Sequence, residues 1–275
     1  MANAPKPTTP KNDSSKGSGI FAGLAMLICI ALGWLLFLFV MGHGSNFEGG
    51  DPANHPIPGN YFGMVYKGGY IVPFLMSMFL MVIVFSFERF FVISKAAGSG
   101  NVDAFVRKVQ SLLTSGNVES AISECDKQKG SVAAVIKSGL LKYKEVETDT
   151  VMDTEQKCLA IQKDIEEATA LEMPMLEQNL TIIATLVSVG TLGGLLGTVT
   201  GMIKAFGGLA TAGAPDQAQL ANGISEALIN TATGIATSLL AVISYNFFTS
   251  KIDSLTYSID EAGFSIIQTY AATHK

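Results

Sequence analysis

The sequence predicts an all-α integral membrane protein with four transmembrane helices and a helical cytoplasmic domain. Only 15% of its 275 residues are charged, whereas soluble domains average roughly 25%. Four runs contain no Asp, Glu, Lys or Arg, and each is long enough to cross a hydrocarbon core of roughly 30 Å. They cover residues 17–47, 68–87, 178–203 and 227–250. Between the second and third runs, apolar residues recur at helical spacing.

The distribution of Lys and Arg predicts the orientation of the four spans. The tail before the first span has three of these residues, the 43–68 loop has one, the 88–178 segment has eleven and the 205–222 loop has none. Cytoplasmic segments carry the excess of positive charge. Both termini and the long middle segment are therefore expected in the cytoplasm.

These boundaries divide the chain into nine expected segments. In order, they are a disordered cytoplasmic tail (1–18), a first transmembrane helix (19–42), a periplasmic loop (43–69), a second transmembrane helix (70–93), a helical cytoplasmic domain (94–178), a third transmembrane helix (179–209), a second periplasmic loop (210–222), a fourth transmembrane helix (223–250) and a cytoplasmic C-terminal helix (251–275).

Several local features refine this division. The first run is interpreted as a retained span rather than a cleaved signal peptide, because it exceeds 20 residues and lacks a small-x-small cleavage site. Glu88 and Arg89 are expected to form an ion pair with a positional role at the cytoplasmic surface, and Pro174 is expected to kink a helix that enters the membrane. The three cysteines, Cys29, Cys125 and Cys158, have no disulfide or zinc spacing and are interpreted as small buried apolar residues.

A polar stripe runs along the whole fourth span. Its residues are Glu226, Asn230, Thr233, Thr237 and Ser244. At about 100° per residue they lie within roughly 40° of one line down a helix. Polar side chains on one face of a membrane helix point at protein or water, so the stripe indicates a pathway through the bilayer.

The third span carries hydroxyl groups and glycines on different faces. The hydroxyls start from Thr181 and continue with Thr185, Ser188, Thr191 and Thr198. The glycines are Gly190, Gly193, Gly194, Gly197 and Gly201, about 150° away on a helix. Small residues every four positions let membrane helices approach closely, so the glycine face is expected to pack. Each hydroxyl either lines a water-holding space or bonds back to its own helix.

Glu226 lies near the outward start of the fourth span, and Lys204 lies near the outward end of the third. A carboxylate inside a bilayer usually marks an ion pathway or has a partner. One hypothesis is that Lys204 and Glu226 pair or share a water-filled vestibule. The alternative is that each side chain reaches the surface separately.

Enzyme activity, cofactors and nucleic acid are not expected. The sequence has no phosphate-binding loop, no metal-spaced histidine pair and no Ser/His/Asp set. We therefore expect no ATPase, no bound metal and no other cofactor. The net charge of −5 is spread over the cytoplasmic part, which suggests no nucleic-acid partner.

Two motifs resemble a known family. Residues 192–206, LGGLLGTVTGMIKAF, resemble the GLxGTVxGxxxxF signature of the MotA/TolQ/ExbB proton-channel family, and residues 223–232, GISEALINTA, resemble its GIxEALxxTA signature. A looser likeness extends from Val72 to Tyr245. The motifs are most similar to those of ExbB and TolQ.

This resemblance implies a mechanism and a set of partners. In the family, five copies surround two copies of an ExbD/TolR-like subunit, whose single membrane helix carries an essential aspartate. Proton entry to that aspartate drives rotation in the bacterial inner membrane, and a TonB-like protein is a further expected partner. The resemblance also implies that Thr231 and Glu226 face the pore or the partner helix. Thr231 lies about 140° from the Glu226 line on a helix, so the two positions do not share one face.

The chain departs from the family pattern in the third span and at its start. Thr191 and Leu192 occupy the positions where the family usually has a proline and an aromatic residue. The hydroxyl that serves the proton path is therefore left open among Thr185, Ser188 and Thr191. The first span is additional to the usual ExbB/TolQ layout.

The leading functional hypothesis is a proton-channel subunit of an inner-membrane motor that energises outer-membrane transport or envelope processes. The alternative is a non-conducting scaffold that anchors a partner protein. A small-solute transporter is disfavoured because the sequence shows no inverted repeat. The choice of proton or sodium, and the process that is energised, stay open.

Overall fold

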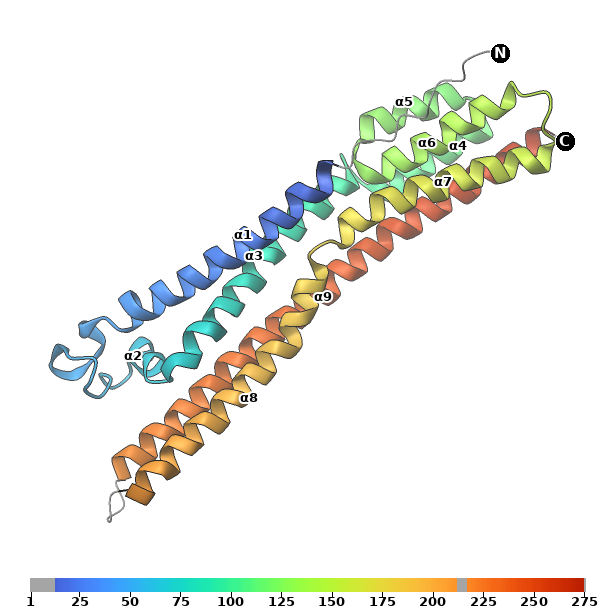
Figure 1. Ribbon diagram of the computed structural model, residues 1–275. Helices are drawn as coiled ribbons and strands as arrows, with labels where there is room; N and C mark the ends of the chain where they lie inside the picture. Colours follow the sequence, from blue (N-terminus) through green and yellow to red (C-terminus); the bar gives the residue numbers. More distant parts are fainter. Residues whose placement is uncertain (1–12, 212–216, 275) are drawn as a thin grey trace, which may run out of the picture. The chain divides into compact units, whose positions relative to one another are not determined.

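Helices account for the regular structure of the described residues. The computed structural model describes residues 13–211 and 217–274, and the side chains of residues 19–207 and 219–274. The only strand-type pairing in this part of the chain is one isolated bridge between Phe47 and Pro56. Four helical stretches are long and apolar enough to cross a membrane (Figure 1), which confirms the predicted class. They lie in Gly19–Met41, Gly69–Thr114, Thr154–Gly207 and Gln219–Thr273.

The α-helices are numbered in chain order, as Figure 1 labels them. They are α1 (Asp13–Leu35), α2 (Tyr61–Tyr66), α3 (Val72–Ala97), α4 (Val102–Thr114), α5 (Val118–Gln128), α6 (Gly130–Glu147), α7 (Thr154–Glu177), α8 (Leu180–Thr211) and α9 (Gln217–Thr273). A π-helical turn, Leu36–Met41, continues α1, and 3₁₀ turns cover Gly44–Asn46, Glu48–Gly50 and Gly69–Ile71.

The chain divides into two compact units. The first unit consists of Met1–Val84 and Ser188–Ser238, and the second consists of Phe85–Val187 and Leu239–Lys275. Helices α3, α8 and α9 each contribute residues to both units.

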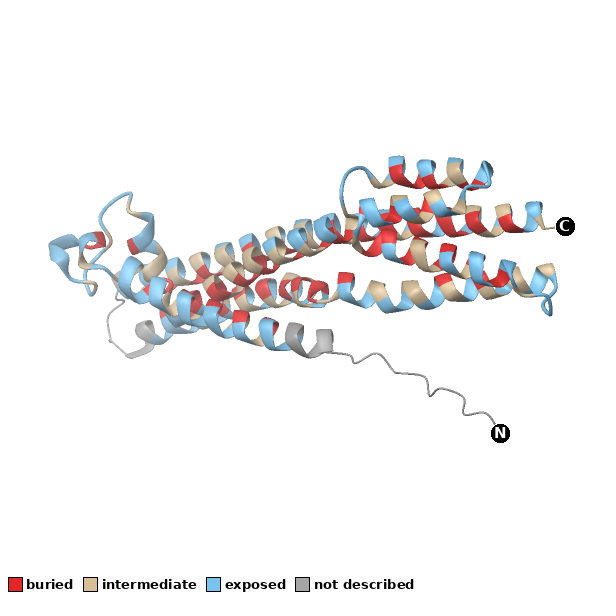
Figure 2. Ribbon diagram, turned by 90° about the horizontal axis from the view of Figure 1, so that it is seen from above, coloured by how far each residue is buried: buried red, intermediate tan, exposed pale blue. Residues whose placement is uncertain are grey.

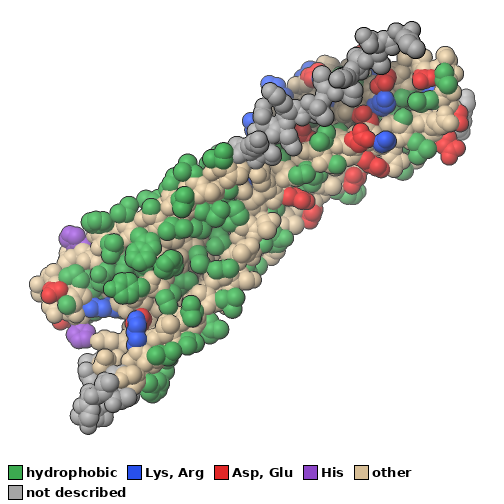
Figure 3. Space-filling view, in the orientation of Figure 1, with side chains coloured by type: hydrophobic (Ala, Val, Ile, Leu, Met, Phe, Trp, Pro, Cys, Tyr) green, Lys and Arg blue, Asp and Glu red, His purple; other side chains and the backbone are tan. Residues whose placement is uncertain are grey.

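In the first unit, α1 packs on the start of α3 through small and aromatic residues. Gly33 lies against Ser77, and a Cβ atom at Gly33 would be 3.0 Å from the backbone oxygen of Pro73. Next to this close approach, the Trp34 and Phe74 rings meet edge to face, with centroids 5.5 Å apart. The outward faces of α1, α8 and α9 carry large exposed apolar side chains, as Figure 3 shows for one face of the molecule. Such surfaces are expected where lipid or another membrane helix provides the surroundings.

The second unit contains a bundle of helices whose buried interior is mostly apolar (Figure 2). Three of its helices, α4, α5 and α7, begin at capping residues: the Asn101, Asn117 and Asp153 side chains accept hydrogen bonds from backbone N–H groups of the first turns. Cys125 is 2% exposed, and desolvation by burial raises the pKa of its thiol to about 12. Cys125 is thus the small buried apolar residue that the sequence predicts.

Arg89 ties the end of α7 to α3 within the second unit. Its side chain is buried, pairs with the Glu88 carboxylate, and donates hydrogen bonds to the Met175 and Leu176 carbonyls at 3.2 and 3.0 Å. The last carbonyls of a helix have no partner within the helix, so the guanidinium satisfies groups that would otherwise be unpaired. This arrangement gives the Glu88–Arg89 pair a positional role.

The break between α7 and α8 lies beyond the proline expected to produce it. Pro174 is inside α7, and the chain changes direction at Gln178 and Asn179, where Asn179 has a φ of 63°. The Gln178 N–H donates to the Pro174 carbonyl. Asparagine tolerates this left-handed conformation better than most residues do, so the break occurs there.

Two other boundaries differ from the expected ones. Helix α1 begins at Asp13, inside the expected tail, while residues 1–12 lie outside the described part. Helix α9 continues without interruption to Thr273, past the expected boundary at residue 250. Lys251 and Asp253 mark a change of surroundings, but no Gly or Pro follows Tyr245 before Gly263 to end the helix.

Replacing Arg89 with methionine should destabilise the second unit. Arg89→Met removes two charge-assisted hydrogen bonds and leaves Glu88 unpaired, which should cost about 3 kcal/mol. Thermal unfolding in detergent measures this effect. Arg107→Met is the matched control, because Arg107 is exposed and donates only to the nearby Asp103 carbonyl. Equal shifts in Tm for the two variants would contradict the role assigned to Arg89.

Candidate functional site

The first unit contains a close antiparallel contact between α8 and α9, lined by glycine (Figure 1). A Cβ atom at Gly194 would lie 3.1 Å from the Asn230 carbonyl oxygen, and one at Gly234 would lie 2.5 Å from the Gly190 oxygen. Gly197 and Gly201 meet Asn230 and Ala227 in the same way. The exception in the glycine set is Gly193, whose nearest neighbour is Leu75 of α3. Four of the five glycines expected to pack therefore meet α9, and the fifth meets α3.

Within this contact, two threonines from opposite helices meet. The Thr198 and Thr231 hydroxyls hydrogen-bond to each other, and both are partly buried. Each also lies 3.1 Å from a carbonyl of its own helix: Thr198 Oγ1 from Gly194 and Thr231 Oγ1 from Ala227. A hydroxyl has one proton and two lone pairs. The pair therefore keeps free acceptor capacity and can change its donor and acceptor roles.

A second hydroxyl contact follows seven residues along each helix. Thr191 Oγ1 donates to Ser238 Oγ at 2.8 Å. Thr191 precedes Thr198 on α8 by seven residues, and Ser238 follows Thr231 on α9 by seven residues. The two contacts therefore lie roughly 10 Å apart along the helices. Together they form a short ladder of neutral polar groups between α8 and α9.

The ladder differs from the candidates that the sequence suggested for the third span. Thr185, Ser188 and Thr191 are all exposed, but only Thr191 belongs to the ladder, and Thr185 donates to its own helix at the Thr181 carbonyl. Thr198 was not among the three candidates, although it lies inside the first motif. Its position opposite Thr231 could have been recognised only from the register of the two helices.

The stripe on the fourth span faces protein inside this chain. Asn230 and Thr237 are fully buried, and Asn230 Nδ2 donates to the Gly68 carbonyl at 2.9 Å. Thr233 and Thr237 donate to the carbonyls of Ile229 and Thr233 at 2.9 Å. The hydroxyls of these two threonines therefore bond back to their own helix and do not line a water-holding space. Ser244, the last stripe residue, lies in the second unit and is partly exposed.

Lys204 and Glu226 meet where α8 ends and α9 begins. Lys204 Nζ lies 2.5 Å from Glu226 Oε1, with the carboxylate side chain only 12% exposed. A cavity of about 520 Å³ adjoins them, lined by Lys67, Lys204, Gly207, Gln219, Asn222, Gly223 and Glu226. Gly69, at a φ of 77°, passes directly against the Glu226 carboxylate, where a Cβ atom would clash. The structure thus places the two side chains together beside a shared polar cavity.

No acidic, basic or histidine side chain lies between this charged pair and the other ends of the two spans. Residues 180–203 of α8 and 227–250 of α9 contain no Asp, Glu, Lys, Arg or His. The polar side chains that remain are hydroxyls and the amides of Asn230 and Asn246, which hold water without binding an ion tightly. The described residues also contain no group of three or more potential metal ligands. A carboxylate, imidazole or amine at the site would therefore have to come from outside these two segments.

The Lys204–Glu226 contact should be measurable as a coupling free energy. Lys204→Ala, Glu226→Gln and the double variant should give a coupling of about 0.5–1 kcal/mol in thermal unfolding, because the lysine is half exposed. The control cycle replaces Lys67, which donates to the Pro52 and Ala53 carbonyls. Additive effects in the Lys204 cycle, or unchanged assembly and ion flux in Lys204→Ala, would contradict a role for the pairing.

Comparison with known proteins places this site within a family. Residues 127–261 match the MotA/TolQ/ExbB proton channel family. The chain is 32% identical over 124 residues to the Tol-Pal system protein TolQ of Pseudomonas aeruginosa, covering 45% of this chain and 54% of that protein. It is 34% identical over 88 residues to a putative biopolymer transport protein, ExbB-like 3, of Synechocystis, covering 31% and 42% of the two chains.

A third relative shows the same pattern. The biopolymer transport protein ExbB of Salmonella typhimurium is 33% identical over 85 residues, which cover 31% of this chain and 35% of that protein. The matched part of this chain spans about half the length of TolQ and less of the other two relatives. The family match includes Thr198, Thr231 and the Lys204–Glu226 pair. Through residues 127–261, this multi-pass membrane protein belongs to the MotA/TolQ/ExbB proton channel family, with relatives of the ExbB and TolQ type.

Proposed function

We propose that this chain is the proton-channel subunit of an inner-membrane motor that converts proton-motive force into mechanical work for outer-membrane transport or envelope processes. The observation that carries the proposal is the Thr198–Thr231 hydroxyl pair, held inside a glycine-lined contact between two uncharged helical segments. Proton movement needs groups that both donate and accept, and paired hydroxyls do this without a fixed charge. The family match and the ExbB and TolQ relatives support the same function.

The chemistry of the site calls for a partner that brings a carboxylic acid. A carboxylate in the bilayer interior costs several kcal/mol unless it is hydrogen-bonded or hydrated. Hydroxyl donors at Thr198 and Thr231 would reduce that cost while the acid is ionised. Once the acid is protonated, it would no longer need these donors and could leave them. We propose an ExbD/TolR-like single-span subunit with an aspartate as this partner, with a TonB-like protein as the recipient of the work.

A groove on α8 supports the approach of such a membrane helix. It has a volume of about 540 Å³ and is lined by Leu195, Thr198, Val199, Met202, Ile203 and Phe206. Five of these side chains are apolar, as a lipid-embedded partner helix requires, and Thr198 is the polar group among them. An acidic side chain on a helix in this groove would reach the hydroxyl pair. A ring of copies around the partner, a pentamer in our proposal, would surround it with several such grooves.

The proposed topology follows the Lys and Arg distribution. Both termini, the segment 94–178 and the region 251–275 would face the cytoplasm, and the loops 43–69 and 210–222 would face the periplasm. The first span, 19–42, would lie beside the second at the periphery, where its exposed apolar side chains face lipid.

A non-conducting scaffold is the second candidate function. It is favoured by the number of hydroxyls that bond to their own helix: Thr185, Thr200, Thr233 and Thr237 all do so. Hydroxyls engaged in this way need no water and no ion. In a scaffold, the glycine contact would only hold α8 and α9 together and present a surface for the partner.

Removing one hydroxyl of the pair should separate the two functions. Thr231→Val keeps the shape of the side chain but removes the hydroxyl that meets Thr198. Proton-driven work should then fall at least about tenfold, because losing a hydrogen bond worth ~1.4 kcal/mol raises the transport barrier by that amount. Proton uptake into liposomes that contain the chain with its single-span partner measures this. Thr233→Val is the control, because that hydroxyl bonds only to its own helix. Unchanged uptake in Thr231→Val would favour the scaffold.

Labelling with a membrane-impermeant thiol reagent should establish the topology. In a chain without native cysteines, Ala53→Cys should react in intact cells with a permeabilised outer membrane, because it is exposed in the proposed periplasmic loop. Thr150→Cys, exposed between α6 and α7, should react only after the inner membrane is opened. The opposite pattern would show that the chain is inserted the other way round.

A further inference from the structure

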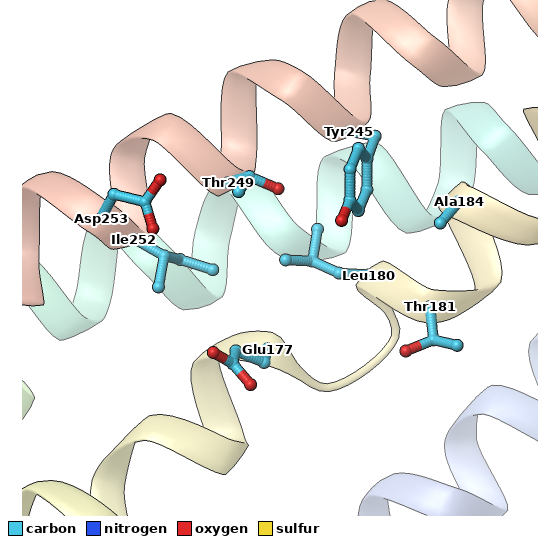
Figure 4. A pocket seen from close by; sticks show the side chains of 8 residues that line it. All are labelled: Glu177, Leu180, Thr181, Ala184, Tyr245, Thr249, Ile252 and Asp253. Carbon is cyan, nitrogen blue, oxygen red and sulfur yellow. The ribbon is translucent and has the colours of Figure 1, made fainter.

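The second unit contains a cavity that the proposed proton path does not use. It lies where α7 ends and α8 begins beside α9 (Figure 4), and its volume is about 390 Å³. Eight residues line it: Glu177, Leu180, Thr181, Ala184, Tyr245, Thr249, Ile252 and Asp253. The α9 residues among them are spaced at four, seven and eight residues from Tyr245, which places them on one face of the helix. The break at Asn179 leaves the opposite wall to Glu177 and the first turn of α8.

Three polar side chains of this cavity lack an ion-pair or hydrogen-bond partner among the described residues: Glu177, Asp253 and Thr249. Within the described residues, no lysine, arginine or histidine forms an ion pair with Glu177 or Asp253, whereas Glu88 and Glu124 have cationic partners. The nearest lysine along α9, Lys251, lies over the Phe247 ring, 5.9 Å from its centroid. In addition, Thr249 Oγ1 is buried and has no hydrogen-bond partner. A buried unpaired hydroxyl indicates a missing water or ligand group.

The apolar walls restrict the kind of ligand. Leu180 and Ile252 are buried side chains of the wall, and Tyr245 contributes an aromatic ring. A metal ion fits poorly, because the described residues offer no group of three or more acidic, His or Cys ligands. A long cationic side chain fits both parts of the lining: its aliphatic stem packs on apolar surface and its head group donates hydrogen bonds to carboxylates and hydroxyls. Tyr245 can also take a cation over its ring.

We infer that this cavity binds an arginine or lysine side chain from the positively charged cytoplasmic segment next to the membrane helix of a single-span partner. The inference rests on the proposed function and names a second contact for the same partner, outside the membrane. Single-span proteins carry their excess of Lys and Arg on the cytoplasmic side of the span. The cavity begins at the residues that end the uncharged run of α8, on the side where this chain carries its own excess of Lys and Arg. Charge and location therefore agree.

Peptide binding to the whole protein tests the inference. The full chain in phosphatidylcholine nanodiscs is titrated with fluorescein-labelled tetra-arginine amide, and binding is followed by fluorescence anisotropy. The variant Glu177→Gln/Asp253→Asn should bind the peptide roughly three- to tenfold more weakly, because two ion pairs with exposed carboxylates are lost. Binding to the wild type should weaken with added NaCl. The single variant Thr249→Val should also bind the peptide more weakly than the wild type, although it changes no charge.

The matched control removes the same charge elsewhere. Glu172→Gln/Asp260→Asn changes two carboxylates of α7 and α9 that do not line the cavity, and it should bind like the wild type. Equal binding by the cavity variant and the wild type would overturn the inference, as would equal weakening in the control. Competition by millimolar MgCl₂ beyond the effect of NaCl at the same ionic strength would replace it with a metal site.

This measurement is independent of the proposed function. Peptide binding at equilibrium requires no proton flux, so Thr231→Val should bind the peptide normally even if proton-driven work is lost. Normal uptake in Thr231→Val would count against the proton path alone. Equal peptide binding by the cavity variant and its control would count against the cavity site alone.

Discussion

The close approach of α8 and α9 at Gly190, Gly194 and Gly234 makes the candidate site possible. In lipid, no hydrophobic force drives helices together, so association relies on backbone contact between small residues and on polar contacts across the interface. Glycine permits a separation at which the short hydroxyls of Thr198 and Thr231 can meet. A larger side chain at Gly194 or Gly234 would separate the helices and with them the hydroxyls, so packing and chemistry have a common origin.

The hydroxyl contacts between α8 and α9 are polar but uncharged. The charged pair Lys204–Glu226 lies at one end of the two uncharged segments, and near the other end lie Glu177 and Asp253, which form no ion pair among the described residues. Within residues 180–203 and 227–250, the polar side chains are hydroxyls and the amides of Asn230 and Asn246. These two segments offer hydrogen-bonding groups but no carboxylic acid, which is why the proposed function includes a partner that brings one.

Much of the fold follows from local pattern, and the differences have identifiable causes. The four apolar stretches depend on neighbouring residues in the chain, so the sequence predicts them well. Helix boundaries at the membrane are predicted less well, because α9 passes Lys251 without a break. A change from lipid to water alters which side chains are favourable, but it does not remove backbone hydrogen bonds. The break at Asn179 instead of Pro174 likewise depends on backbone conformation and on the Arg89 contacts.

Residue type and spacing are enough to define the class of the protein, its apolar segments, its glycine and hydroxyl faces and its family. They do not define which hydroxyls meet, and for that the folded chain is needed. Thr198 faces Thr231 and Thr191 faces Ser238, while Thr233 and Thr237 bond to their own helix. The physical reason is that periodicity gives the face of a residue but not the register between two helices. That register comes from fitting one backbone against another at the glycines.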